Sequence, residues 1–143
     1  MRLKGKTAII TGGASGFGAG IASSFSKEGA KVIIADINMQ NADKIAKKLD
    51  GFSIRVDVSN KASVKTAIAE TLGKVEKIDI LVNNAGITHL PSPMEQVSEE
   101  EFDNILAVNT KSVFLTSHYL IPHFKEHKSG VILNIASTAG VSP

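Results

Sequence analysis

Short apolar runs alternate with longer stretches of helical periodicity along the whole chain, and this alternation constrains the fold more than any other feature. The apolar runs lie at 7–11, 32–35, 54–58, 78–82 and 131–135. Between them, apolar side chains recur three or four residues apart, as in amphipathic helices. Strands that alternate with helices are typical of a parallel sheet covered on both faces. The sequence therefore predicts an α/β domain with a doubly wound parallel sheet.

Four helices are expected between these strands. Each of the first three has an apolar stripe and a glycine at its end. The stripes are Phe17, Ile21 and Phe25 in the first helix, Ala42, Ile45, Ala46 and Leu49 in the second, and Val64, Ala67, Ile68 and Leu72 in the third. The fourth helix begins at a capping box formed by Ser98 and Glu101 and continues to about His127. Pro122 predicts a kink near its end.

The third apolar run orders the strands. Residues 54–58 alternate apolar and charged side chains, which suits the edge of a sheet, whereas the other runs suit its interior. With right-handed crossovers, this favours the strand order 3-2-1-4-5. Residues 131–135 then form the opposite edge, apolar on both faces and without a neighbour. We therefore expect a sheet that is truncated before its last strands.

Composition excludes several classes of function. The 143 residues suit a single domain, and 43% of them are apolar, enough for a core. The 16 basic and 14 acidic residues form no basic block, which argues against a nucleic-acid or membrane partner. There is no cysteine, and the N-terminus lacks a signal-type apolar segment. A cytoplasmic protein is the simplest expectation.

A glycine-rich turn joins the first strand to the first helix. Gly12, Gly16 and Gly18 allow the backbone to turn sharply and approach a pyrophosphate at the helix N-terminus. Asp36 ends the second strand, where a carboxylate can accept both ribose hydroxyls. The plain alternative is a tight turn followed by a solvated aspartate. The joint pattern predicts dinucleotide binding.

Five motifs in order give the chain a family resemblance. They are T-G-x-x-x-G-x-G at 11–18, Asp57-Val58, N-N-A-G at 83–86, Asn109 within V-N-T, and Ser137 within N-I-A-S. The chain resembles the short-chain dehydrogenase/reductase family in its classical form, over essentially its whole length. The resemblance implies one NAD(P)-binding Rossmann domain over residues 1–143, incomplete at its C-terminus.

The resemblance also implies roles for individual residues. Ser137 and Asn109 match catalytic positions. The cofactor-binding positions are Gly12, Ser15, Gly16, Phe17, Gly18, Asp36, Ile37, Asp57, Val58, Asn84, Ala85 and Gly86. Simpler interpretations exist: Asp57 as an edge-strand charge, Asn83 as a residue that holds neighbouring backbone, Asn109 as a helix interruption, and Ser137 as a strand-end hydroxyl.

The cofactor is predicted to be NAD. In the family, a cation that balances the 2′-phosphate of NADP commonly precedes the middle glycine or follows the second-strand acid. Ser15 and Ile37 occupy these places here, and both are uncharged. Asp36 would repel the phosphate, so both observations favour NAD.

The implied chemistry is hydride transfer between nicotinamide and a secondary alcohol or ketone. Candidate substrates are a 3-oxoacyl thioester, a sugar or a hydroxy acid. The family completes its site with a Tyr-x-x-x-Lys helix, and the only tyrosine, Tyr119, is out of register. We expect that helix beyond Pro143, and a tetramer or dimer for the complete protein. The alternative is a nucleotide-binding module without catalysis.

Two histidines raise the question of a metal. His123 and His127 are four residues apart, a spacing that can place two ligands on one helical face. No third ligand is evident from the sequence. We therefore expect a solvated helix end and no metal site.

Overall fold

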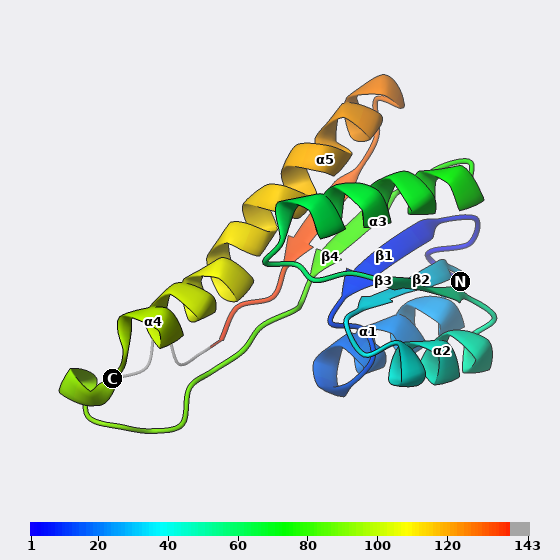
Figure 1. Ribbon diagram of the computed structural model, residues 1–143. Coiled ribbons are helices and arrows are strands. Elements are labelled where there is room, and N and C mark those ends of the chain that lie inside the picture. The colour runs from blue at the N-terminus through cyan, green and yellow to red at the C-terminus, as the bar shows by residue number, and fades with distance from the viewer. Residues whose placement is uncertain (138–143) are drawn as a thin grey trace.

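The computed structural model describes residues 1–137, which form a parallel sheet with helices on both faces (Figure 1). Its strands are β1 (Thr7–Thr11), β2 (Lys31–Asp36), β3 (Phe52–Arg55), β4 (Ile80–Asn83) and β5 (Val131–Asn134). Their order is β3-β2-β1-β4-β5, with every neighbouring pair parallel. The predicted fold class and strand order are confirmed.

Two helical layers cover the two faces of the sheet. Helices α1 (Gly16–Lys27) and α2 (Met39–Lys48) cover one face, and α3 (Lys61–Lys74) and α5 (Ser112–Glu126) cover the other (Figure 1). Successive residues of the central strands point to opposite layers: Ile9 belongs to the α3–α5 core and Ile10 to the α1–α2 core. This double burial explains why the central strands are continuous apolar runs.

The two edge strands differ in burial. β3 ends at Arg55, earlier than expected, but the alternation continues past its end, since Val56 and Val58 are buried while Arg55 is exposed. In β5, by contrast, Val131 is 58% and Leu133 41% exposed. Within the described residues β5 pairs with β4 alone.

The predicted fourth helix is not regular throughout. It consists of α4 (Glu99–Leu106), a π-helical turn (Ala107–Lys111) and α5, and a short 3-10 turn (Met94–Gln96) precedes it. Ser98 caps α4, because its Oγ accepts a hydrogen bond from the Glu101 N–H at 3.1 Å. Pro122, where a kink was predicted, lies inside the continuous α5. The break in regular α-helix lies at the π-helical turn, which contains Asn109, and the side chain of Asn109 is hydrogen-bonded to the loop after β4.

The apolar stripe predicted for the first helix is wrong at Phe17. That side chain is 85% exposed, and the buried positions of α1 are Gly18 and Ala22. Small residues face the sheet here because the helix packs closely against the glycine-rich turn. No helix among residues 1–137 is long and apolar enough to cross a membrane.

Candidate functional site

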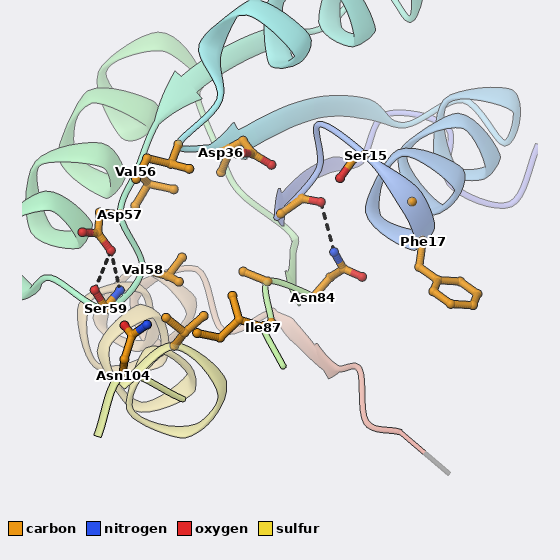
Figure 2. Close-up of a pocket in the computed structure, with 17 residues that line it drawn as sticks. Ser15, Phe17, Asp36, Val56, Asp57, Val58, Ser59, Asn84, Ile87 and Asn104 are labelled. Atoms are coloured by element: carbon orange, nitrogen blue, oxygen red, sulfur yellow. Dashed lines mark hydrogen bonds between the residues drawn. The ribbon is translucent and has the colours of Figure 1, made fainter. Parts of the chain in front are cut away.

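An open cleft of about 580 Å³ lies where the chain leaves the carboxyl ends of β1 to β4 (Figure 2). All of the predicted cofactor-binding residues except Gly18 line it. They come from four segments that are far apart in the sequence: the glycine-rich turn, the end of β2, the segment after β3 and the segment after β4. Ligand sites in doubly wound sheets occupy this edge.

The glycines of the turn are required by its geometry. Gly12 has φ +62°, and a Cβ there would lie 2.9 Å from the Ala85 Cα. A Cβ on Gly18 would lie 2.1 Å from the Gly12 carbonyl oxygen, so Gly18 permits close packing of α1 and has no place in the cleft lining. Gly16 has φ +50° with open space around it. The turn therefore presents bare backbone to the cleft, as a pyrophosphate needs.

Asn84 and Thr11 fix the backbone of this turn. The Asn84 side-chain amide donates to the carbonyl oxygens of Thr11 at 3.0 Å and Gly12 at 3.1 Å, the latter bond being drawn in Figure 2. The Thr11 hydroxyl accepts from the N–H groups of Asn84 and Ala85. β1 and β4 are thereby tied together at the floor of the cleft.

Asn83 does not hold backbone, contrary to one interpretation of the sequence. Its Nδ2 donates to Asn134 Oδ1 at 2.9 Å, and its Oδ1 accepts from the Thr116 hydroxyl at 2.7 Å. It therefore connects β4 to β5 and α5, because its side chain points to the opposite side from that of Asn84.

Helix α1 opens beside the cleft without a side-chain cap. Ser15 is its N-cap residue, with extended backbone, and its hydroxyl makes no capping hydrogen bond. Uncapped N–H groups and the helix dipole favour an anion at this end. Phe17 borders the cleft, but its ring points away into solvent (Figure 2).

Asp36 is held in place by two backbone amides. Its Oδ2 accepts from the Ala14 N–H at 3.0 Å and its Oδ1 from the Asn38 N–H at 2.9 Å. Each carboxylate oxygen keeps a further lone pair for a ligand hydroxyl. Arg55 is its partner in strand register but does not line the cleft. Among the described residues that do line it, there is no lysine, arginine or histidine.

Asp57 is oriented by its own turn. Its Oδ1 accepts from the Ser59 N–H at 2.9 Å and the Ser59 hydroxyl at 2.6 Å, while its N–H donates to Ser63 Oγ. The neighbouring valines supply an apolar wall. Asp57 thus lies past the end of β3 and borders the cleft (Figure 2), and its role there stays a prediction.

Sequence reasoning missed six residues that line the cleft. They are Ala35, Val56, Ser59, Ile87, Asn104 and Val108. Asn104 and Val108 come from α4 and the π-helical turn, which face the strand ends across the cleft. No local motif marks them, because their position depends on how the loop after β4 returns the chain.

Asn109 does not line this cleft. Its Oδ1 accepts from the Ile87 N–H and its Nδ2 donates to the Ile87 carbonyl oxygen, both at 2.8 Å. The side chain thus anchors the loop after β4 to the π-helical turn. Together with Asn134 and Ile135 it lines a second hollow, beyond β5. Ser137, three residues past β5, is exposed.

The expectation of a solvated helix end is wrong for His123. This side chain is only 9% exposed, and its Nε2 accepts the Ile78 N–H at 3.1 Å. Burial, together with the nearby His127, lowers its pKa and favours the neutral ring. Glu126 is a third potential ligand that sequence reasoning did not find. However, the lone pair of His123 that would bind a metal is already used, and the other nitrogen carries the proton.

Comparison with known proteins decides the family. The sequence profile described as "short chain dehydrogenase" matches residues 6–143. The chain belongs to the short chain dehydrogenase family. Its relatives include a 4-formylbenzenesulfonate dehydrogenase of Comamonas testosteroni, 41% identical over 100% of this chain and 59% of that protein. A 3-oxoacyl-[acyl-carrier-protein] reductase of Thermotoga maritima is 36% identical over 99% of this chain and 59% of that protein.

A solved short chain dehydrogenase shares the fold of this chain closely. The 3-ketoacyl-(acyl-carrier-protein) reductase of Brucella melitensis, complexed with NADH, is 47% identical with a TM-score of 0.92. The match covers 96% of this chain and 59% of that one. The chain thus spans about 59% of the length of these relatives.

Proposed function

We propose that the protein is an NAD-dependent oxidoreductase that interconverts a secondary alcohol and a ketone. The observation that carries this proposal is the convergence of an uncapped helix N-terminus, bare glycine backbone and Asp36 on one cleft. When bound, NAD supplies the hydride acceptor and NADH the hydride donor. The residues of this chain then have to bind, orient and discriminate the cofactor.

The residues present fit such a dinucleotide. The N-terminus of α1 and the glycine turn would hold the pyrophosphate, and Asp36 would accept the hydroxyls of the adenosine ribose. Asp57 and Val58 would flank the adenine. The preference for NAD rests on Asp36, since its carboxylate repels a 2′-phosphate and no cationic side chain lines the cleft among the described residues.

Ser137 is proposed to polarise the substrate oxygen, and Asn109 to position the site. Since its side-chain amide is bonded to Ile87, Asn109 acts through the loop that it anchors. The presence of both residues favours an enzyme over a nucleotide-binding module. The relatives named above point to no single substrate, so thioesters, sugars and hydroxy acids all belong in the screen. A tetramer or dimer is proposed for the protein.

The test is a titration of the protein with NADH and NADPH, followed by nicotinamide fluorescence. We expect NADH to bind about tenfold more tightly or better, corresponding to about 1.4 kcal/mol. Equal affinities, or tighter binding of NADPH, would contradict the NAD proposal. In a protein that also carries the expected Tyr-x-x-x-Lys helix, Ser137→Ala should lower kcat far more than it weakens NADH binding, and an unchanged kcat would exclude Ser137 from catalysis.

A further inference from the structure

We infer that Asn104 on α4 reads the adenine base of the dinucleotide and confers selectivity for it. This inference rests on the proposed NAD binding and adds to it a residue that none of the five motifs contains. Asn104 lines the same cleft as Asp57, from the opposite wall (Figure 2).

The slot between these walls has the character of a base-binding site. Val56 and Val58 line it on the strand side, and Ile87 and Val108 on the helix side. Aliphatic side chains on both sides suit the flat faces of a purine, because removing those faces from water costs little free energy. The polar groups that line the slot can then contact only the edges of the ring.

Asp57 supplies an acceptor at this slot. Its Oδ1 is already engaged by the Ser59 N–H and hydroxyl, whereas its Oδ2 makes no hydrogen bond within residues 1–137. A carboxylate can only accept, so Oδ2 matches one hydrogen of the adenine 6-amino group.

Asn104 can supply a hydrogen-bond donor, which the Asp57 carboxylate cannot. Its side-chain amide makes no hydrogen bond with any residue in the part of the chain that the structure describes. An amide offers both a donor and an acceptor, which match adenine N7 and the second amino hydrogen; this is the bidentate pair by which asparagine reads adenine elsewhere. Asp57 and Asn104 together therefore complement both sides of the 6-amino group.

The experiment combines two changes, one in the protein and one in the base. NADH and its 7-deazaadenine analogue, in which N7 is replaced by a carbon, are titrated against the unsubstituted protein, Asn104→Ala and Asn104→Leu. Asp103→Ala is the matched control, since Asp103 is an exposed neighbour on α4 that does not line the cleft. Asn104→Leu restores the volume of the wall without its hydrogen bonds.

We expect the unsubstituted protein and Asp103→Ala to bind the analogue two- to tenfold more weakly than NADH. Both Asn104 variants should bind NADH and the analogue with equal affinity. If the loss caused by the analogue persists in the Asn104 variants, or never occurs in the unsubstituted protein, the base-reading role is overturned while NAD binding stands. If NADH itself does not bind, the proposed function fails, and this inference with it.

Discussion

Carboxylates at the two ends of the sheet differ in their partners within residues 1–137: one at the amino end forms ion pairs, and two at the carboxyl end do not. At the amino end, the buried Asp79 accepts the Thr7 N–H at 3.0 Å and forms ion pairs with Lys6 at 3.2 Å and Lys77 at 3.1 Å. At the carboxyl end, Asp36 and Asp57 accept hydrogen bonds from backbone amides and a serine hydroxyl, and neither forms an ion pair within the described residues.

This difference separates charges that stabilise the fold from charges available to a ligand. Asp79 is neutralised by its own chain, so its charge contributes to stability and has little left to offer a ligand. Asp36 and Asp57 are oriented by hydrogen bonds, form no ion pair within the described residues, and keep free lone pairs in an open cleft. Electrostatics and topology therefore both favour the carboxyl end of the sheet as the functional end.

The strongest test of this division is Gly18→Ala, at the carboxyl end. The new Cβ would overlap the Gly12 carbonyl oxygen, and we expect the free energy of unfolding to fall by about 1–3 kcal/mol or more. NADH binding should weaken as the turn shifts. Gly20→Ala is the control, because a Cβ there meets nothing within 4 Å and should stabilise the helix by up to about 1 kcal/mol. Urea unfolding measures both, and equal effects would contradict the packing role of Gly18.

Asp79→Asn should lower stability and leave cofactor binding unchanged. The substitution removes the charge that two lysines and the Thr7 amide compensate, at a cost of about 1–2 kcal/mol at neutral pH. Urea unfolding and an NADH titration of the same variant test both halves of the expectation. A loss of NADH affinity at unchanged stability would contradict the assignment of Asp79 to stability and of the carboxyl-end aspartates to ligand binding.

The contribution of Asp79 should depend on pH in a defined direction. Burial alone would raise the pKa of this carboxyl, but the Thr7 N–H and the ammonium groups of Lys77 and Lys6 outweigh it and lower the pKa. The stabilisation is therefore complete above the unfolded-state pKa, near pH 4, and is lost as the pH falls through the lower folded-state value. The stability difference between wild type and Asp79→Asn should shrink on acidification, and a constant difference down to pH 2 would contradict this.

The exchange of cofactor preference has the smallest expected effect. Asp36→Ala with Ile37→Arg replaces a repulsion by a charge-assisted hydrogen bond, so the ratio of NADPH to NADH affinity should rise about tenfold. Ile37→Arg alone, which keeps the carboxylate, serves as the control and should shift the ratio less. Because Asp36 also accepts the Ala14 N–H, stability must be measured in parallel. An unchanged ratio in the double variant would show that Asp36 does not set the preference.

The sequence predicts the fold well because its patterns are local. Alternation around Arg55 identifies an edge strand, and the glycine spacing from Gly12 to Gly18 specifies a turn whose geometry the structure reproduces. All predicted cofactor residues except Gly18 meet in one cleft, because parallel strands bring their carboxyl ends to the same edge.

Contacts that depend on the return path of the chain were not predictable. Asn104 and Val108 reach the cleft only through the placement of α4, and no periodicity reveals it. Helical spacing placed Phe17 in the core, yet close packing of Gly18 turns that face of α1 toward the sheet instead. The burial of His123 could not be predicted for a similar reason, since its hydrogen-bond partner Ile78 is distant in sequence.

The π-helical turn at Ala107–Lys111 sets the rotational phase between two parts of one long helix. Each residue advances an α-helix by about 100°, so the wider turn rotates α4 relative to the repeat that α5 follows against the sheet. If these five residues relaxed to α-helical geometry with the sequence unchanged, Leu115, Leu120 and Phe124 would stay in the core and α4 would rotate by about a quarter of a revolution relative to them. Asn104 would then leave the cleft, so the wider turn is what brings this side chain to the candidate site.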